Sequence, residues 1–256
     1  MRLQDKVIIV TGATAGIGAA IATRIVAEGG RVLVHGLDRP AGEAVVARLG
    51  PSARLHLDDL VDPASAGRIT AAAQGAFGRI DGLVNNAALV ARSTLASTDA
   101  GQFDRMMAVN VRAPLLLIQA AFPALQAARG AVLNIGSVNA LSGEATLLDY
   151  SISKGALQTL SRNLANAHAA SGVRINHFNV GWVLTEREYA MQVSEGQAKD
   201  WHLRLPPVFA PSGALMRPED IAAAAVYWLG DESRPVNGAV VDVEQFCIHG
   251  RNPVKV

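Results

Sequence analysis

The sequence predicts an α/β fold: a doubly wound parallel sheet of about seven strands with helices on both faces. Short apolar segments rich in β-branched residues alternate with longer segments of helical periodicity along nearly the whole chain. Strands that read as continuous apolar runs are typical of parallel sheets buried on both faces. Alternating strands and helices favour right-handed crossovers between parallel strands.

The first two strands enclose a glycine-rich turn. Residues 7–10 (VIIV) read as a buried strand, 11–18 (TGATAGIG) as a turn, and 16–28 as a helix that ends at a glycine pair, before a second strand at 31–34. Small residues in such a turn let backbone N–H groups approach a phosphate at the positive end of the helix. The spacing is not the dinucleotide fingerprint G-x-G-x-x-G, and any tight turn favours glycine. The position between strand and helix nevertheless favours nucleotide binding.

The rest of the chain continues the alternation. Further strands are predicted at 53–56, 82–85, 131–135, 174–179 and 239–243, and further helices at 41–49, 63–76, 99–127, 150–171 and 218–229. The 256 residues, half of them apolar, can bury one large core, and no repeat or low-complexity linker divides them, so a single domain is expected. Ligands of such sheets bind at the carboxyl ends of the strands.

Tyr150 and Lys154 lie four residues apart in a predicted helix, so they share one of its faces. An unperturbed tyrosine has a pKa of about 10, too high for proton transfer at neutral pH, and a nearby positive charge lowers it. The pair is therefore a candidate acid/base device. The spacing alone is common on helix surfaces, so the interpretation depends on further motifs.

Those motifs, in register with the turn and the Tyr-Lys pair, resemble the short-chain dehydrogenase/reductase family. Asp59-Leu60 is similar to the family's adenine contact, and residues 85–88 (NNAA) resemble its N-N-A-G motif with Ala88 for Gly. Residues 180–185 (VGWVLT) resemble its P-G-x-x-x-T segment with Val180 for Pro. The resemblance covers nearly all of the chain. It implies a Rossmann-type domain that transfers a hydride between a nicotinamide cofactor and a secondary alcohol or ketone.

The resemblance also implies a catalytic tetrad of Asn110, Ser137, Tyr150 and Lys154. Tyr150 would exchange the proton of the reacting oxygen, and Ser137 would hydrogen-bond that oxygen. Lys154 would lower the Tyr150 pKa and hold the nicotinamide ribose. Asn110 would hold a water molecule that links Lys154 to solvent. Turn formation and capping are the alternative roles for Ser137 and Asn110.

The cofactor is expected at the turn and the strand ends. The implied contacts are Gly12, Thr14, Ala15, Gly16, Ile17, Gly18, Leu37, Asp38, Asp59, Leu60, Asn86, Ala87, Tyr150, Lys154, Gly181, Val183 and Thr185. Gly36 and Leu37 stand where NAD-preferring relatives usually carry Asp and many NADP-preferring ones carry Arg. Asp38 could bind the ribose 2′-OH from a displaced position, whereas Arg39 could reach a 2′-phosphate. We therefore expect NAD, with NADP as the alternative.

Residues 186–217 resemble the family's substrate lid in their position and carry a polar and aromatic mixture. Such donors suit hydroxylated or anionic ligands better than steroids or acyl chains. The predicted substrate contacts are Arg92, Asn139, Glu144 and Trp182. A sugar, polyol or sugar acid is the favoured substrate, and the alternative is that these charges only solvate a loop. An NADP-linked 3-oxoacyl reductase and a nucleotide-binding regulator without catalysis stay open as other functions.

Composition limits the partners. A net charge of +1 gives no case for nucleic acid, and no apolar run reaches the roughly 18 residues that span a membrane. The single Cys247 and the absence of a signal-peptide pattern suit a reducing cytoplasm. No metal site is predicted. The resemblance implies a homotetramer, in which the tail from Phe246 to Pro253 with Arg251 could reach a neighbouring subunit.

Overall fold

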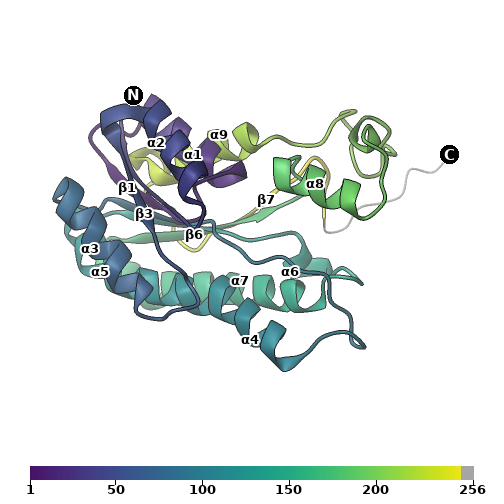
Figure 1. The fold of residues 1–256 in the computed structure, drawn as a ribbon. Coiled ribbons are helices and arrows are strands. Elements are labelled where there is room, and N and C mark those ends of the chain that lie inside the picture. Colours follow the sequence, from purple (N-terminus) through teal and green to yellow (C-terminus); the bar gives the residue numbers. More distant parts are fainter. Residues whose placement is uncertain (249–256) are drawn as a thin grey trace.

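The computed structural model describes residues 1–248 and contains a seven-stranded sheet between two helical layers (Figure 1). The strand order is β3-β2-β1-β4-β5-β6-β7, and every neighbouring pair is parallel. The strands are β1 (Val7–Val10), β2 (Arg31–Gly36), β3 (Ala53–Leu57), β4 (Gly82–Asn85), β5 (Ala131–Ile135), β6 (Arg174–Val180) and β7 (Val240–Val243). The predicted fold class is therefore confirmed.

Helices cover both faces of the sheet, as Figure 1 shows. One face carries α1 (Gly16–Ala27), α2 (Arg39–Leu49) and α9 (Pro218–Leu229). The other carries α3 (Ser65–Phe77), α4 (Ala100–Met107), α5 (Ala113–Ala128) and α7 (Leu148–Ala167). Two short helices, α6 (Asn139–Ser142) and α8 (Glu186–Ser194), follow β5 and β6.

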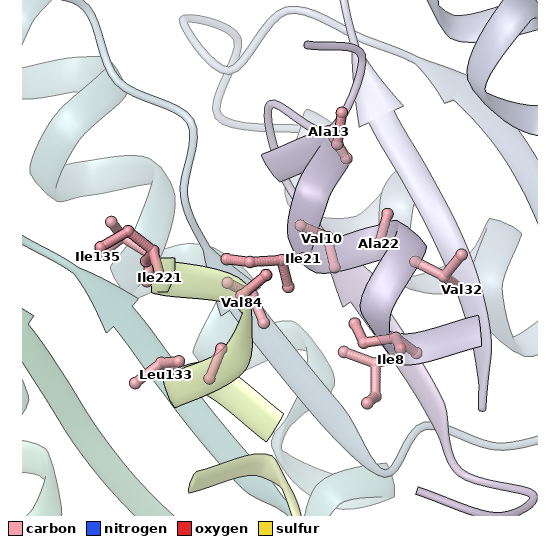
Figure 2. Packing of buried hydrophobic residues seen from close by; sticks show 14 of the residues in the cluster. Ile8, Val10, Ala13, Ile21, Ala22, Val32, Val84, Leu133, Ile135 and Ile221 are labelled. Atoms are coloured by element: carbon pink, nitrogen blue, oxygen red, sulfur yellow. The ribbon is translucent and has the colours of Figure 1, made fainter. Parts of the chain in front are cut away.

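The apolar core explains why the strands read as continuous hydrophobic runs. Ile8 and Val10 of β1 pack with Ile21 of α1 and Ile221 of α9 (Figure 2). Burying each such side chain contributes about 1.5–3 kcal/mol to the free energy of unfolding. A second cluster on the opposite face includes Ile9 and is closed by α3 and α5. Since residues of one strand belong to both clusters, both faces of the sheet are covered by apolar side chains.

The predicted helix 99–127 is interrupted. A π-helical segment, Ala108–Arg112, separates α4 from α5. π-Segments often accompany functional sites because they re-aim side chains, and this one contains Asn110. The continuous stretch from 100 to 128 is long and apolar enough to cross a membrane by length and composition, contrary to our reading of the sequence. It is partly buried, and its α5 packs against α3, as expected for a core helix.

Other boundaries differ by a few residues. β2 runs to Gly36, two residues beyond the prediction, because His35 and Gly36 pair with β3. The helix predicted over 150–171 begins at Leu148 and ends at Ala167. The segment 186–217 contains α8 and a short 3₁₀ turn at Trp201–Leu203. Arg251, predicted to reach a neighbouring subunit, lies outside the described residues.

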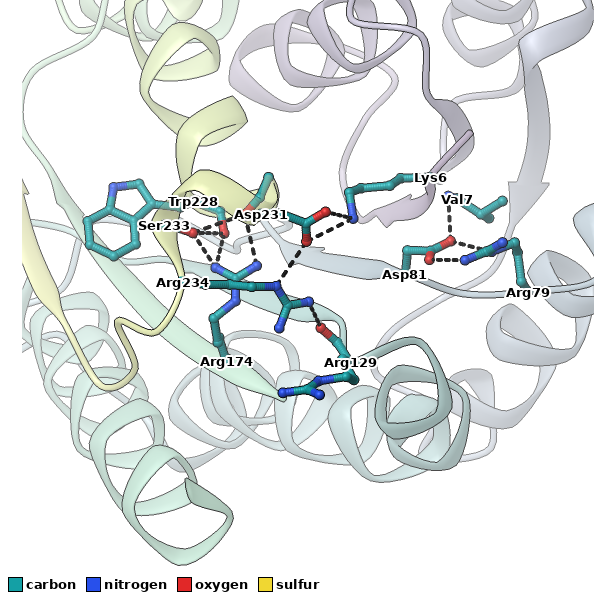
Figure 3. A network of polar contacts seen from close by, with 11 residues as sticks. Lys6, Val7, Arg79, Asp81, Arg129, Arg174, Trp228, Asp231, Ser233 and Arg234 are labelled. Atoms are coloured by element: carbon teal, nitrogen blue, oxygen red, sulfur yellow. Dashed lines mark hydrogen bonds and ion pairs between the residues drawn. The ribbon is translucent and has the colours of Figure 1, made fainter. Parts of the chain in front are cut away.

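A charged network closes the amino ends of the strands (Figure 3). The Asp81 carboxylate accepts a hydrogen bond from the Val7 N–H at 2.9 Å and pairs with Arg79. Asp231 pairs with Lys6 and Arg234. These contacts join the start of β1 to the segments before β4 and after α9. The opposite edge of the sheet, where the predicted functional residues lie, is left to form the site.

Candidate active site

A groove of about 540 Å³ follows the carboxyl ends of the first four strands. Its lining includes most residues that the sequence assigns to the cofactor: Gly12, Thr14, Ala15, Gly16, Ile17, Leu37, Asp38, Asp59, Leu60, Asn86, Ala87 and Thr185. Five others lie elsewhere. Gly18 packs beneath the turn, Val183 is buried, Lys154 is buried behind Tyr150, and Tyr150 and Gly181 line a second cavity.

The glycine turn packs closely against the start of α1. Gly12 has φ +61°, and a Cβ at Gly18 would lie only 2.2 Å from the Gly12 carbonyl oxygen. Helix α1 therefore sits directly on the turn. No side chain caps its first turn and no acidic residue lies there, so the positive end of the helix is free to meet an anion.

Asn86, directly after β4, holds this turn in place by hydrogen bonds. Its side-chain amide donates to the carbonyl oxygens of Thr11 at 2.9 Å and Gly12 at 3.1 Å. The Thr11 hydroxyl in turn accepts from the backbone N–H groups of Asn86 and Ala87. The structure thus gives the second Asn of the NNAA motif a role in holding the turn, which spacing alone did not reveal.

The end of β2 explains the missing acid at position 36. A Cβ there would lie 2.5 Å from Thr14 Cγ2, so the Thr14 side chain fills the space that an aspartate would need. Asp38 lines the groove instead and caps α2 by accepting from the Ala41 N–H at 3.0 Å. Arg39 is largely exposed and pairs with Glu43 on its own helix.

The second cavity, of about 1020 Å³, contains the predicted reacting groups. It adjoins the groove at two neighbouring residues, since Leu89 lines the groove and Val90 lines the cavity. Ser137 and Tyr150 line it, and their side chains share a hydrogen bond that lowers the pKa of the Tyr150 phenol. Lys154 is buried, donates to the Ile135 carbonyl at 2.8 Å, and places its Nζ 5.5 Å from the centre of the Tyr150 ring.

Burial dominates the electrostatics of this pair. It raises the pKa of Tyr150 to about 12, although the Ser137 hydrogen bond lowers it, and the charges of Glu188 and Glu144 raise it further. Burial also lowers the pKa of Lys154 to about 8. Our expectation that Lys154 lowers the Tyr150 pKa is wrong for this structure, because desolvation of the phenolate outweighs any help from the ammonium group.

Asn110 connects the loop after β4 to α7. Its amide donates to the Leu89 carbonyl and to Ser153 Oγ, both at 2.9 Å, and its oxygen accepts from the Leu89 N–H at 2.8 Å. Ser153 passes the connection on to the Tyr150 carbonyl at 2.7 Å. The π-segment therefore positions Asn110 to hold the backbone beside the reacting phenol.

Comparison with known proteins identifies the family. A family model described as enoyl-(acyl carrier protein) reductase matches residues 12–245. The 2-(S)-hydroxypropyl-CoM dehydrogenase 3 of Xanthobacter autotrophicus is 34% identical over 95% of this chain and 96% of its own. A probable short-chain type dehydrogenase/reductase of Bradyrhizobium diazoefficiens is 36% identical over 97% and 88%, respectively. The D-threitol dehydrogenase of Mycolicibacterium smegmatis is 34% identical over 93% and 91%. The chain belongs to the short-chain dehydrogenase/reductase family.

Solved structures of family members have the same fold. The 3-oxoacyl-(acyl-carrier-protein) reductase of Agrobacterium tumefaciens, with NADP bound, superposes with a TM-score of 0.85 at 27% identity and covers 94% of this chain and 93% of its own. The 3-ketoacyl-(acyl-carrier-protein) reductase of Brucella melitensis, complexed with NADH, gives 0.83 at 26% identity, with coverages of 94% and 97%. The predicted family and enzyme class are confirmed.

All four predicted substrate residues of this dehydrogenase/reductase line the second cavity: Arg92, Asn139, Glu144 and Trp182. Arg92, however, is not free to bind an anion. It makes a two-pronged ion pair with Glu195 at 2.7 and 2.9 Å and a third contact with Glu144 at 3.2 Å. Its charge is matched within the protein.

Several lining residues were missing from the prediction. Those of the groove include His35, Asp58, Arg105 and Arg187, and those of the cavity include Glu188, Trp201, Phe209 and Glu244. A signal for Glu188 was present, because Thr185-Glu186-Arg187-Glu188 has the spacing of a helix capping box. Glu244 lies directly after β7. Among residues 1–248 there is no cluster of His, Cys, Asp or Glu suited to a metal ion.

Proposed function

We propose that this chain is an NAD-preferring dehydrogenase that interconverts a secondary alcohol and a ketone on a small polyhydroxylated compound. The observation that carries the proposal is the meeting of Ser137, Tyr150 and the buried Lys154 where the cavity joins the groove. A phenol that can transfer a proton, next to a groove suited to a nucleotide cofactor, fits hydride transfer to or from a carbon that carries a hydroxyl group.

The groove fits a nicotinamide dinucleotide. The uncapped amino end of α1 would hold the pyrophosphate, and Asp59 and Leu60 would lie against the adenine. When bound, the nicotinamide supplies the acceptor or donor of the hydride. Asp38 would bind a ribose 2′-OH and repel a 2′-phosphate, while Arg39 is paired with Glu43 outside the groove. This arrangement supports NAD over NADP.

The catalytic residues would divide the remaining work. Tyr150 would donate its phenolic proton to the carbonyl oxygen during reduction and accept the hydroxyl proton during oxidation. Ser137 would hydrogen-bond the same oxygen and fix its position. Lys154 would contribute charge near the phenol and hold the nicotinamide ribose. Asn110, bound to Leu89 and Ser153, would keep the Tyr150 backbone in place.

The substrate class is inferred from the cavity wall and the relatives. Trp182, Trp201 and Phe209 offer aromatic faces, and Asn139, Glu144 and Glu188 offer polar groups. A relative that covers the chain nearly end to end is named a D-threitol dehydrogenase. Because Arg92 is neutralised by Glu195 and Glu144, a neutral sugar or polyol is favoured over a sugar acid.

One alternative keeps a specific observation in its favour. The two solved structures compared above are named as reductases of acyl-carrier-protein substrates, so an NADP-linked 3-oxoacyl reductase is the second candidate. A nucleotide-binding regulator without catalysis is the third, and the presence of all four tetrad residues speaks against it. A homotetramer and a cytoplasmic location stay predictions.

The deciding experiment is a parallel screen of the purified protein. Sugars, polyols and sugar acids are offered with NAD and with NADP, and acetoacetyl-CoA is offered with NADH and with NADPH. The proposal expects the highest kcat/KM with a neutral polyol or sugar and NAD. Faster reduction of acetoacetyl-CoA with NADPH would establish the second candidate. No turnover of any compound, with nucleotide binding intact, would favour the regulator.

A further inference from the structure

One wall of the large cavity is not used by the proposed proton transfer. It consists of Glu188 from α8, Glu244 from the segment after β7, and Trp182 between them, and we call it the carboxylate wall. All three residues line the same cavity as Tyr150. The charge of Glu188 also acts on the Tyr150 phenol, which places this wall within electrostatic reach of the reacting oxygen.

Glu188 is directed to the cavity by a half-formed capping box. Its backbone N–H donates to the Thr185 hydroxyl at 3.0 Å, as in the usual motif. The side chain does not return to the Thr185 N–H, which instead bonds the Val183 carbonyl. Its Oε1 accepts from Trp182 Nε1 at 2.8 Å and Gln192 Nε2 at 3.0 Å. These two donors fix the carboxylate and leave Oε2 available as an acceptor.

Glu244 is held by backbone groups in the same wall. Its Oε2 accepts from the Trp182 N–H at 3.0 Å and its Oε1 from the Gln245 N–H at 2.6 Å. A Cβ at position 181 would lie 1.8 Å from Glu244 Oε2, so only glycine at 181 leaves room for this carboxylate. Each carboxylate oxygen can accept more than one hydrogen bond, which leaves acceptor capacity on Glu244 as well.

The nearby cations are paired elsewhere, although the charge of Arg92 still acts on Glu188 at a distance. Arg92 is engaged by Glu195 and Glu144, and Arg204 is paired with Asp200. Residues 1–248 supply neither Glu188 nor Glu244 with an ion-pair partner. The cavity is therefore rich in hydrogen-bond acceptors and unfavourable for anions. Strong acceptors of this kind match hydroxyl donors, and a negative ligand there would be repelled.

The aromatic members provide a matching apolar surface. Trp182 stacks on Trp201 with ring centroids 5.5 Å apart, and Phe209 meets Trp182 edge-on at 6.1 Å. An aromatic face beside fixed acceptors suits a molecule whose C–H groups and hydroxyl groups point in different directions. A polyol carbon chain has this property, whereas a simple alcohol uses only the aromatic part.

We propose that Glu188 and Glu244 form a subsite that accepts hydrogen bonds from substrate hydroxyl groups beyond the reacting carbon. The subsite selects polyols over monoalcohols and rejects anionic analogues. This inference rests on the proposed dehydrogenase function, since it concerns the substrate of the same cavity.

A series of four-carbon substrates tests the subsite: 2-butanol, 2,3-butanediol and D-threitol differ in hydroxyl number, and 3-hydroxybutyrate adds a negative charge. In the wild type with NAD, kcat/KM should rise with hydroxyl number and be lowest for the anion. Glu188→Gln and Glu244→Gln should each lower the threitol-to-butanol ratio of kcat/KM by about 10-fold or more, because a hydrogen bond to a charged acceptor is lost. Glu219→Gln, exposed on α9, is the matched control and should leave this ratio unchanged.

Failure of this inference can be separated from failure of the proposed function. If the wild type oxidises these alcohols but both variants keep the wild-type ratio, the subsite is wrong and the dehydrogenase function stands. If nothing in the series is turned over, calorimetric titration of D-threitol into Tyr150→Phe protein saturated with NAD decides the subsite without catalysis. Threitol binding that weakens about 10-fold or more in the Tyr150→Phe/Glu188→Gln protein supports it. No binding, or binding that this second substitution does not change, overturns it.

Discussion

Among single residues, Tyr150 carries the proposed chemistry. Tyr150→Phe removes only the phenolic oxygen, so it should lower kcat by about 10²-fold or more while the affinity for NAD stays within a few-fold of the wild type. Steady-state kinetics and fluorescence titration of NAD measure the two quantities. Tyr227→Phe, on the surface helix α9, is the control. A kcat near that of the wild type would remove Tyr150 from the mechanism.

The raised pKa of Tyr150 predicts a pH dependence. Burial raises this pKa to about 12, so the phenol is protonated at neutral pH and the base form needed for oxidation is scarce. Below its pKa, the phenolate fraction grows about tenfold per pH unit, and kcat/KM for alcohol oxidation should rise as the pH increases from 6 to 8. Above about 8, Lys154 loses its charge and the rise should weaken. A profile that is flat from pH 6 to 8 would contradict this reading.

Asp38 has two roles that can be separated by substitution. It lines the groove where a ribose would lie, and it caps α2 through the Ala41 N–H. Asp38→Ala removes both, whereas Asp38→Ser keeps a capping oxygen and removes the charge. Both variants should lower the NAD-to-NADP ratio of kcat/KM by about 10-fold, and only the alanine variant should lose about 1 kcal/mol of unfolding free energy. An unchanged ratio in both would show that cofactor choice lies elsewhere.

Between elements, a buried chain of polar side chains joins the sheet to α7. Asn134 bonds Ser161, Ser161 bonds His177 at 3.0 Å, and His177 bonds Asn179 at 3.1 Å. Asn179 continues to Gln158 at 2.9 Å. Because His177 is fully buried, its neutral form is favoured, and desolvation together with the Lys154 charge lowers its pKa to about 3.

This histidine makes the stability sensitive to acid. Its folded pKa of about 3 lies below the unfolded value of about 6.5, so the unfolded chain binds the proton first as the pH falls. The contribution is complete above about pH 6.5 and is lost towards pH 3, at about 1.4 kcal/mol per pH unit. Between pH 7 and 4.5, the free energy of unfolding measured in urea should fall for both proteins. The fall should be about 2–3 kcal/mol smaller for His177→Asn than for the wild type. The exposed His168→Asn is the control, and identical losses in all three proteins would refute the assignment.

The same scale shows what the sequence could and could not predict. β1 and β5 were found because strands buried on both faces are written as unbroken apolar runs. The π-segment at 108–112 was not, because nothing in its residues or their spacing distinguishes a π-turn from an ordinary helical turn. Glu188 was missed for a related reason: the capping spacing predicts a side chain that returns to the helix start, and only the fold shows that Trp182 and Gln192 draw it into the cavity.

The whole molecule brings the site together from distant parts of the chain. The groove uses the ends of β1 to β4, whereas the cavity adds the segment after β5, the start of α7, and residues 186–217. Motif order predicted this convergence, since every motif follows a strand in a parallel sheet. The pairing of Arg92 with Glu195 could not be predicted, because the two residues are 103 positions apart and no local pattern links them. The sequence assigned Arg92 to the substrate instead.

That ion pair connects the proposed lid to the loop after β4. Glu195 lies just beyond α8, and both of its oxygens contact Arg92. Both side chains are about one-third exposed, so the pair contributes no more than about 1 kcal/mol and is weakened by salt. Glu195→Gln should therefore raise the substrate KM about 3- to 5-fold through a less stable closed lid, with the NAD affinity unchanged. In the wild type, 0.5 M NaCl shortens the Debye length several-fold relative to dilute buffer, so it should also raise KM. A KM that responds to neither change would mean that the segment is fixed by its apolar cluster of Trp201, Ala210 and Leu215 alone.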